Sequence, residues 1–339
     1  MLRLLTAISL LFLAGFVATL LSARGAAAAA AACAGGDLLA AMQKDDPEKA
    51  AAIAAEAERT PNGKGLLWSV EKDGRRSYLY GTIHMTDPRV VTLGPAAAEA
   101  FDGARTVVIE TTDVLDKASM TRALLSRPDL TMFTDGTTLT SLLPEGEVAA
   151  VEKALDERGI PLASVAKMKP WMLSAMLALP ACELARQADG EPVLDMKLAE
   201  QAKAGGKALR GLETAVDQLE AMASLPMAFH VTGLVDTLKL GDRVNDVVET
   251  MVVLYQKGDT GMFWPLFRAA LPSASDDGSG YAAFEETMVT ARNHTMAERA
   301  APILDEGDAF IAVGALHLPG PQGLVELLRK AGYTVTAVN

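Results

Sequence analysis

Two histidines of this chain share one local setting, three residues after a glycine at the end of an apolar run. Gly81–His84 follows Ser77–Tyr80, and Gly314–His317 follows Ala309–Val313. Ligands gather at the carboxyl ends of strands in open α/β sheets, and glycine there permits positive φ and close backbone approach. Imidazole is the commonest protein ligand for transition metals. Because the chain has only four histidines, the duplication predicts one metal-dependent hydrolytic site. A single segment of this kind would indicate only a hydrogen-bonded polar residue.

Two glutamates have a similar placement. Glu110 and Glu213 each follow a short apolar run. A carboxylate at the end of a buried strand is costly to desolvate unless it meets a cation, a metal ion or hydrogen-bond donors. We therefore predict that Glu110 or Glu213 binds a metal ion with His84 and His317, and that the other glutamate is the base that activates water. The alternative is that each glutamate caps the following helix.

An arginine and an asparagine complete the candidate group. Arg292 and Asn293 lie in a predicted helix before the last strands. Arginine can neutralise a cluster of carboxylates or stabilise a tetrahedral oxyanion. We predict a catalytic role for both residues, whereas the alternative for Arg292 is a surface ion pair. Arg89 is a second candidate for the same role near His84.

The other two histidines have a weaker case. His230 lies in a stretch rich in Met and Leu and is predicted to be packed, and His294 points away from Arg292 on the predicted helix. The sequence contains no nucleophile elbow of the Gly-x-Ser-x-Gly type, no phosphate-binding Walker loop, no His-Glu-x-x-His helix and no paired Cys-x-x-Cys. The common hydrolase, nucleotide-binding and zinc-ribbon patterns are therefore excluded.

Short strands near both ends of the chain must position these residues. The predicted strands are residues 66–70, 77–80, 106–109, 208–212, 309–313 and 333–338. Residues 115–290 are predicted to be mainly helical, and helices are also expected at 34–60 and 95–102. This order predicts an α/β fold with a central mixed β-sheet built from N- and C-terminal strands, flanked by helices and carrying a long helical insert.

The amino-terminal segment has the features of a signal peptide. Arg3 precedes an uncharged apolar run, residues 4–21, and small residues follow through the alanine tract 26–32. We predict that residues 1–32 are a signal peptide and that 33–339 form one domain, periplasmic or secreted. Because the run is 18 residues long, an uncleaved membrane anchor is the alternative.

The net charge limits the possible partners, and the two cysteines bear on the compartment. The formal net charge is -12 and the pI is about 4.9, which argues against nucleic-acid binding because phosphates require a basic surface. The two cysteines, Cys33 and Cys182, are predicted to form a disulfide, since disulfides persist outside the cytosol. Two unpaired thiols are the alternative.

Taken together, these segments resemble the TraB/GumN family, which includes the Tiki metalloproteases and the pheromone-shutdown protein PrgY. The resemblance runs from about residue 66 to residue 338. The segments that carry it are Tyr80–His84, Val108–Thr111, Gly211–Thr214, Arg292–Asn293 and Val313–Leu318. It implies a fold akin to the erythromycin-esterase and ChaN-like group. It also implies peptidase-like activity with Mn²⁺ or Co²⁺, or with Zn²⁺.

The resemblance also implies an active site. It places His84, His317 and Glu110 with Arg292 and Asn293, and it includes Glu213 in a family motif without a defined role. The leading hypothesis is an exported metal-dependent hydrolase, most simply a peptidase, acting on a peptide or small-molecule substrate. The second hypothesis is a binding protein of the same fold that captures a peptide, a pheromone or haem. The third is an esterase that uses a histidine base and is insensitive to chelators.

Overall fold

The β-sheet begins with a hairpin closed by the two-residue turn Asp73–Gly74. Both turn residues adopt positive φ, 50° and 76°, as a tight hairpin turn requires and as Asp-Gly permits. The structure, a computed structural model, describes residues 33–270 and 279–338, so the predicted signal peptide 1–32 lies outside the described residues. The strands are β1 (Leu67–Lys72), β2 (Arg75–Thr82), β3 (Thr106–Ile109), β4 (Ala208–Gly211), β5 (Ala309–Gly314) and β6 (Thr334–Ala337).

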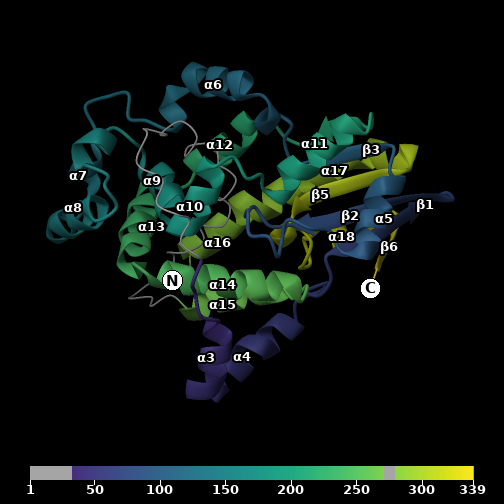
Figure 1. Ribbon diagram of the computed structural model, residues 1–339, viewed down its shortest axis with the longest axis horizontal. Coiled ribbons are helices and arrows are strands. Elements are labelled where there is room, and N and C mark those ends of the chain that lie inside the picture. Colours follow the sequence, from purple (N-terminus) through teal and green to yellow (C-terminus); the bar gives the residue numbers. More distant parts are fainter. Residues whose placement is uncertain (1–32, 271–278, 339) are drawn as a thin grey trace.

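The six strands form one mixed sheet in the order β4-β3-β5-β2-β1-β6. β4, β3, β5 and β2 run parallel to one another, whereas β1 is antiparallel to both β2 and β6. The predicted α/β fold, with a sheet assembled from both ends of the chain, is confirmed. Because four neighbouring strands are parallel, their carboxyl ends meet at one edge of the sheet (Figure 1).

Helices occupy most of the chain between the strands. Before β3 they are α3 (Leu38–Asp45), α4 (Pro47–Glu58) and α5 (Pro95–Gly103). Between β3 and β4 they are α6 (Lys117–Ser126), α7 (Leu139–Leu142), α8 (Val148–Asp156), α9 (Pro170–Leu177), α10 (Ala181–Ala188) and α11 (Leu194–Ala204). After β4 they are α12 (Ala215–Ala223), α13 (Met227–Leu240), α14 (Arg243–Gln256), α15 (Phe263–Ala270), α16 (Ser279–Glu285), α17 (Ala291–Glu306) and α18 (Leu324–Lys330).

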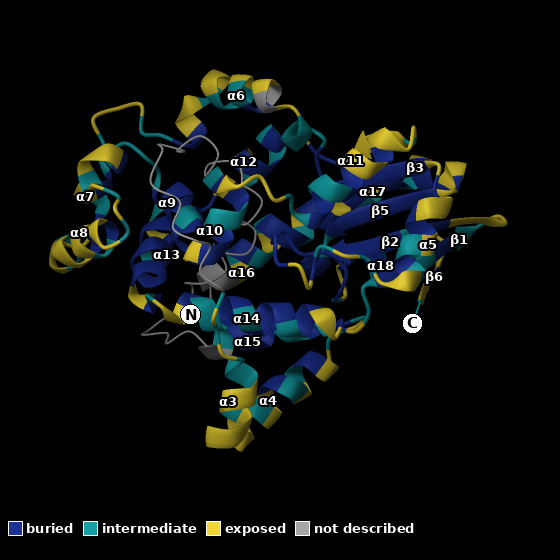
Figure 2. Ribbon diagram, in the orientation of Figure 1, coloured by how far each residue is buried: buried dark blue, intermediate teal, exposed yellow. Residues whose placement is uncertain are grey.

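Both faces of the sheet are covered, because alternate strand residues point to opposite sides. Val108 and Ile311 pack with α17 and α18 on one face, and Val107 and Phe310 pack with α5 and α11 on the other. The inner strands β3 and β5 are almost wholly buried, whereas the edge strands β4 and β6 and the helices α3, α4, α6 and α8 carry exposed surfaces (Figure 2). Burial on both faces explains the continuous apolar runs that predicted β3 and β5.

The remaining helices form a second apolar core beside the sheet. α9, α13, α14 and α15 contribute its largest buried side chains, including Trp171 and Phe267. Cys33 and Cys182 form a disulfide with Cα atoms 5.4 Å apart, which attaches the start of the described chain to α10. Among the described residues, no helix is long and apolar enough to cross a membrane.

Candidate functional site

His84, Glu110 and His317 lie together at the carboxyl edge of the sheet. They follow β2, β3 and β5, which the strand order β3-β5-β2 makes neighbours. Nε2 of His84 lies 3.9 Å from Oε1 of Glu110, and Nε2 of His317 lies 3.8 Å from the same oxygen. All three residues are buried. Three potential ligand atoms therefore converge from parts of the chain that are distant in sequence.

A buried aspartate orients the first imidazole. Nδ1 of His84 lies 3.0 Å from Oδ2 of Asp195, whose Oδ1 accepts a hydrogen bond from the Thr82 hydroxyl at 2.8 Å. Asp195 lies in the first turn of α11 and has no exposed surface. Because both oxygens of Asp195 act as acceptors, Nδ1 of His84 donates and Nε2 faces Glu110. Sequence reasoning missed Asp195, since an acidic residue in a first helical turn is ordinarily explained by the helix dipole.

An asparagine orients the second imidazole. Oδ1 of Asn293 lies 2.6 Å from Nδ1 of His317, and Nδ2 of Asn293 donates to the Gln322 carbonyl at 2.8 Å. The second contact fixes the amide, so Oδ1 is the acceptor and Nδ1 of His317 the donor. Burial lowers the pKa of His317 to about 3, against the attraction of Glu110. His317 is therefore neutral near pH 7, with the Nε2 lone pair directed toward Glu110.

Glu110 is held by donors on both oxygens. Oε1 accepts from the Gly314 amide at 2.7 Å, and Oε2 accepts from Gln218 at 3.0 Å and from Arg292 at 2.6 Å. Burial alone would raise its pKa, but Arg292, the two imidazoles and the Gly314 amide together lower the pKa to about 2. Glu110 is therefore ionised across the physiological range and presents Oε1 to both imidazoles.

Arg292 neutralises two glutamates at once. Its Nη2 lies 2.7 Å from Oε2 of Glu213, and its Nε lies 3.1 Å from both Glu213 oxygens, in addition to the bond with Glu110. Nη1 donates to the Met288 carbonyl at 3.2 Å. Met288 lies in a π-helical turn, Glu286–Thr290, a feature frequent at functional sites. Glu213 thus joins the group through Arg292 and Gln218.

Other atoms lie too close to the glycine of each Gly-x-x-His segment to leave room for a side chain. A Cβ on Gly314 would lie 3.2 Å from Oε1 of Glu110 and 3.4 Å from Nε2 of His84. A Cβ on Gly81 would lie 2.8 Å from Cδ1 of Leu318. The expectation of positive φ is wrong, because neither glycine has it; the space that a side chain would take is the reason for glycine.

The remaining candidates lie elsewhere. Arg89 is bound to Asp87 and Glu249, with Nη2 2.9 and 2.7 Å from their carboxylates. His230 has no exposed surface, and its Nε2 donates to the Met222 carbonyl at 3.1 Å, so the prediction that it is packed is confirmed. His294 is exposed on α17.

The donor set of His84, His317 and Glu110 fits a divalent transition metal. Two imidazole nitrogens and a carboxylate oxygen are ligands that Mn²⁺, Co²⁺ and Zn²⁺ accept. The spacing is wider than in a bound complex, because metal–ligand bonds of about 2.1 Å require donor atoms roughly 3.0–3.4 Å apart. Accordingly, within 33–270 and 279–338, no cluster of three or more His, Cys, Asp or Glu side chains already has metal-binding geometry. The chemistry fits, and the donors must move closer together.

Comparison with known proteins identifies a family and several distant relatives. The TraB/PrgY/gumN family model matches residues 66–337. The chain is 25% identical over 328 residues to the Metalloprotease TIKI homolog of Nematostella vectensis, covering 82% of this chain and 68% of that protein. It is 24% identical over 314 residues to Metalloprotease TIKI1 of Danio rerio, covering 79% and 62%.

A third relative is Metalloprotease TIKI2 of Danio rerio, 24% identical over 321 residues, with coverage of 79% of this chain and 60% of that protein. The chain therefore spans less than two thirds of the length of the two Danio rerio relatives. No solved structure matches significantly.

Proposed function

Because the chain belongs to the TraB/PrgY/gumN family, whose model spans residues 66–337, we propose that it is a metal-dependent hydrolase that cleaves peptides. The observation that carries the proposal is the convergence of His84 Nε2 and His317 Nε2 on Glu110 Oε1, at 3.9 and 3.8 Å. Distant relatives named metalloproteases support the same class of chemistry. A divalent ion, Mn²⁺ or Co²⁺ or else Zn²⁺, supplies Lewis-acid activation of water and of the scissile carbonyl.

The protein holds the two imidazoles in position. Asp195 accepts from Nδ1 of His84, and Asn293 accepts from Nδ1 of His317. Acceptors of this kind fix the tautomer and ring orientation of a metal-binding histidine and raise its basicity. Both acceptors are buried, so water does not compete for Nδ1 of either ring.

The contacts of the charged residues favour one of the roles that the sequence left open for each. Arg292 is bound by both Glu110 and Glu213, and we therefore assign it charge compensation rather than oxyanion stabilisation. Glu110 serves as the anionic metal ligand, because its low pKa keeps it ionised. Glu213 anchors Arg292, which in turn holds Oε2 of Glu110 and leaves Oε1 facing the imidazoles.

We also propose that the protein is exported. The apolar segment and alanine tract within residues 1–32 have the order of a signal peptide. The disulfide between Cys33 and Cys182 suits an oxidising compartment.

Metal binding tests the proposal directly. The full chain is titrated with Mn²⁺, Co²⁺ and Zn²⁺ by calorimetry, as wild type and as His84→Ala and His317→Ala. Wild type is expected to bind at least one ion with micromolar affinity, and each variant to lose at least about tenfold in affinity, because one of three protein ligands is removed. His294→Ala, an exposed histidine, is the matched control. Absence of binding, or an equal loss in the control, refutes the proposal.

Turnover separates a hydrolase from a binding protein. A mixture of diverse peptides is incubated with the metal-loaded chain and analysed by mass spectrometry, with and without EDTA. New cleavage products that EDTA and Glu110→Gln abolish support hydrolysis. Metal binding without any cleavage favours instead the binding protein of the same fold.

A further inference from the structure

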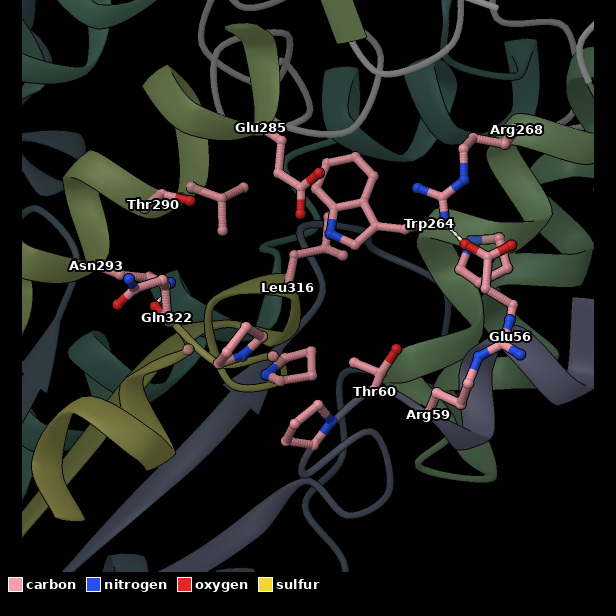
Figure 3. Close-up of a pocket in the computed structure, with 17 residues that line it drawn as sticks. Glu56, Arg59, Thr60, Trp264, Arg268, Glu285, Thr290, Asn293, Leu316 and Gln322 are labelled. Carbon is pink, nitrogen blue, oxygen red and sulfur yellow. Dashed lines mark hydrogen bonds and ion pairs between the residues drawn. The ribbon is translucent and has the colours of Figure 1, made fainter. Parts of the chain in front are cut away.

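A pocket of about 330 Å³ lies next to the candidate site, on the side of Asn293. Its walls come from α15, the π-helical turn, the segment after β5 and the end of α4 (Figure 3). The main apolar lining residues are Trp264, Pro265, Val289, Leu316, Pro319 and Pro321. The volume is at the small end of ligand pockets, so it suits one large side chain with its backbone.

The middle of the pocket is apolar and rigid. Trp264 stands at its centre, and Leu316 lies nearby, directly before His317 in the chain (Figure 3). Proline rings on the loop after Leu316 and beside Trp264 have fixed backbone φ. Little conformational entropy is therefore lost when such walls close on a ligand.

The charges around the pocket balance. One end carries Glu56, Arg59 and Arg268, and Glu285 lies above the centre (Figure 3). Arg268 forms an ion pair with Glu56. With two arginines and two glutamates in the lining, the pocket has no excess charge that would select an ionic side chain.

The end toward the candidate site offers polar groups. Thr290, Asn293 and Gln322 lie together there (Figure 3). Within the described residues, the Thr290 hydroxyl and the Gln322 side-chain amide make no hydrogen bond to the protein. Such donors and acceptors match the amide groups of a peptide backbone. Asn293 connects this end to His317 through its 2.6 Å hydrogen bond.

We propose that this pocket is a substrate subsite that takes a large apolar side chain, leucine- or phenylalanine-like, of an extended peptide. The apolar centre receives the side chain, and Thr290 and Gln322 bind the adjoining backbone. This inference rests on the proposed function, because it names the side chain that the proposed hydrolase would prefer in its peptide substrate. The binding preference itself requires no turnover.

Calorimetry on the metal-free full chain tests the preference. The probes are acetyl-Ala-X-Ala-amide peptides with X as Phe, Leu, Ala, Asp or Lys. The Phe and Leu peptides are expected to bind about tenfold more tightly than the Ala peptide, since a buried large apolar side chain replaces exposed surface. The Asp and Lys peptides are expected to bind no better than the Ala peptide.

Filling the pocket provides the specific control. Thr290→Phe places a ring in the pocket and is expected to remove the preference for Phe and Leu. Thr295→Phe, on α17 and outside the lining, is the matched variant and should retain it. Equal affinities across the peptides, no binding at millimolar concentration, or a preference that survives Thr290→Phe overturns the subsite.

The two proposals fail separately. If the Phe peptide binds with the expected preference but the metal-loaded chain cleaves no peptide, the subsite stands as a peptide-binding pocket and the hydrolase proposal fails. If peptides are cleaved without any preference for apolar residues, the hydrolase stands and the subsite is refuted.

Discussion

A buried hydrogen bond of 3.0 Å links Oδ2 of Asp195, in the first turn of α11, to Nδ1 of His84, just after β2. Asp195 has no exposed surface, and its second oxygen accepts from the Thr82 hydroxyl. The carboxylate therefore has a fixed position from which it sets the orientation of the imidazole. A histidine that is oriented in this way presents Nε2 at a defined place.

Replacing Asp195 is expected to weaken metal binding without removing a ligand. Asp195→Ala should lower the affinity by about 10–100-fold, the usual effect of removing the partner of a metal-binding histidine. Asp195→Asn keeps an oxygen acceptor and should lose less. Calorimetry measures both, with circular dichroism to verify the fold. Asp189→Ala, an exposed aspartate at the end of α10, serves as control. Unchanged affinity in Asp195→Ala would show that the contact does not orient His84.

Loss of Arg292 is expected to destabilise the fold. Arg292→Met leaves Glu110 and Glu213 buried without their shared cation, and breaking a buried ion pair costs about 3–5 kcal/mol. Urea unfolding measures the change in free energy. Arg243→Met, an exposed arginine on α14, should change stability little.

A second substitution separates charge from packing. Glu213→Gln in the Arg292→Met background removes one uncompensated charge and is expected to recover part of the lost stability. If the double variant is no more stable than Arg292→Met, packing of the arginine side chain dominates the effect.

The strands and the polar residues at their carboxyl ends were predictable because the signal is local. Apolar runs mark β2, β3 and β5, and His84, Glu110 and His317 follow them directly in sequence. Parallel strands place their carboxyl ends at one edge, so three strand-end residues of this kind meet once the strands are neighbours. The resemblance to a known family supplied the expectation that these segments belong to one site.

Asp195 and Gln218 were not predictable, because their roles depend on contacts across the fold. Each lies near the start of a helix, where polar residues are ordinary. Their partners, His84 and Glu110, are about a hundred residues away in sequence. For Arg292 the sequence left two roles open, charge neutralisation and oxyanion stabilisation, since spacing alone does not show that Glu110 and Glu213 both bind its guanidinium.

Acid is expected to destabilise the protein partly through His230. Burial lowers the pKa of His230 to about 4, from an ordinary value of 6.5. Below pH 6.5, His230 therefore binds a proton in the unfolded chain, whereas in the folded chain it stays neutral down to about pH 4. The stabilising contribution is complete above pH 6.5 and is lost as the pH falls toward 4, by about 3 kcal/mol.

Urea unfolding at several pH values between 4 and 7.5 measures this loss. His230→Gln retains an N–H donor for the Met222 carbonyl and should show a flatter profile than wild type across the window. His317, with its pKa lowered to about 3, gives a change in the same direction that remains in both proteins. An identical profile in wild type and His230→Gln contradicts the assignment, and the exposed His294→Gln is the control.

The most selective test of the site is a single methyl group at Gly314. Its added Cβ would lie 3.2 Å from Oε1 of Glu110, 3.4 Å from Nε2 of His84 and 3.5 Å from Cδ2 of His317. The backbone of Gly314, with φ -52° and ψ 134°, is one that alanine adopts without strain. Gly314→Ala should therefore fold. Its methyl group would lie between His84, Glu110 and His317 and would prevent these three side chains from moving close enough to bind an ion. We expect metal affinity to fall at least about tenfold, with little change in melting temperature.

Gly103→Ala, where an added Cβ meets nothing within 4 Å, is the matched control and should bind metal as wild type does. Calorimetry and thermal unfolding on the same preparations distinguish a blocked site from a damaged fold. Wild-type affinity in Gly314→Ala would mean that an ion, if bound, does not lie among His84, Glu110 and His317. Loss of affinity with the fold intact places the ion between the two Gly-x-x-His strand ends, because the methyl group reaches no other polar side chain as closely.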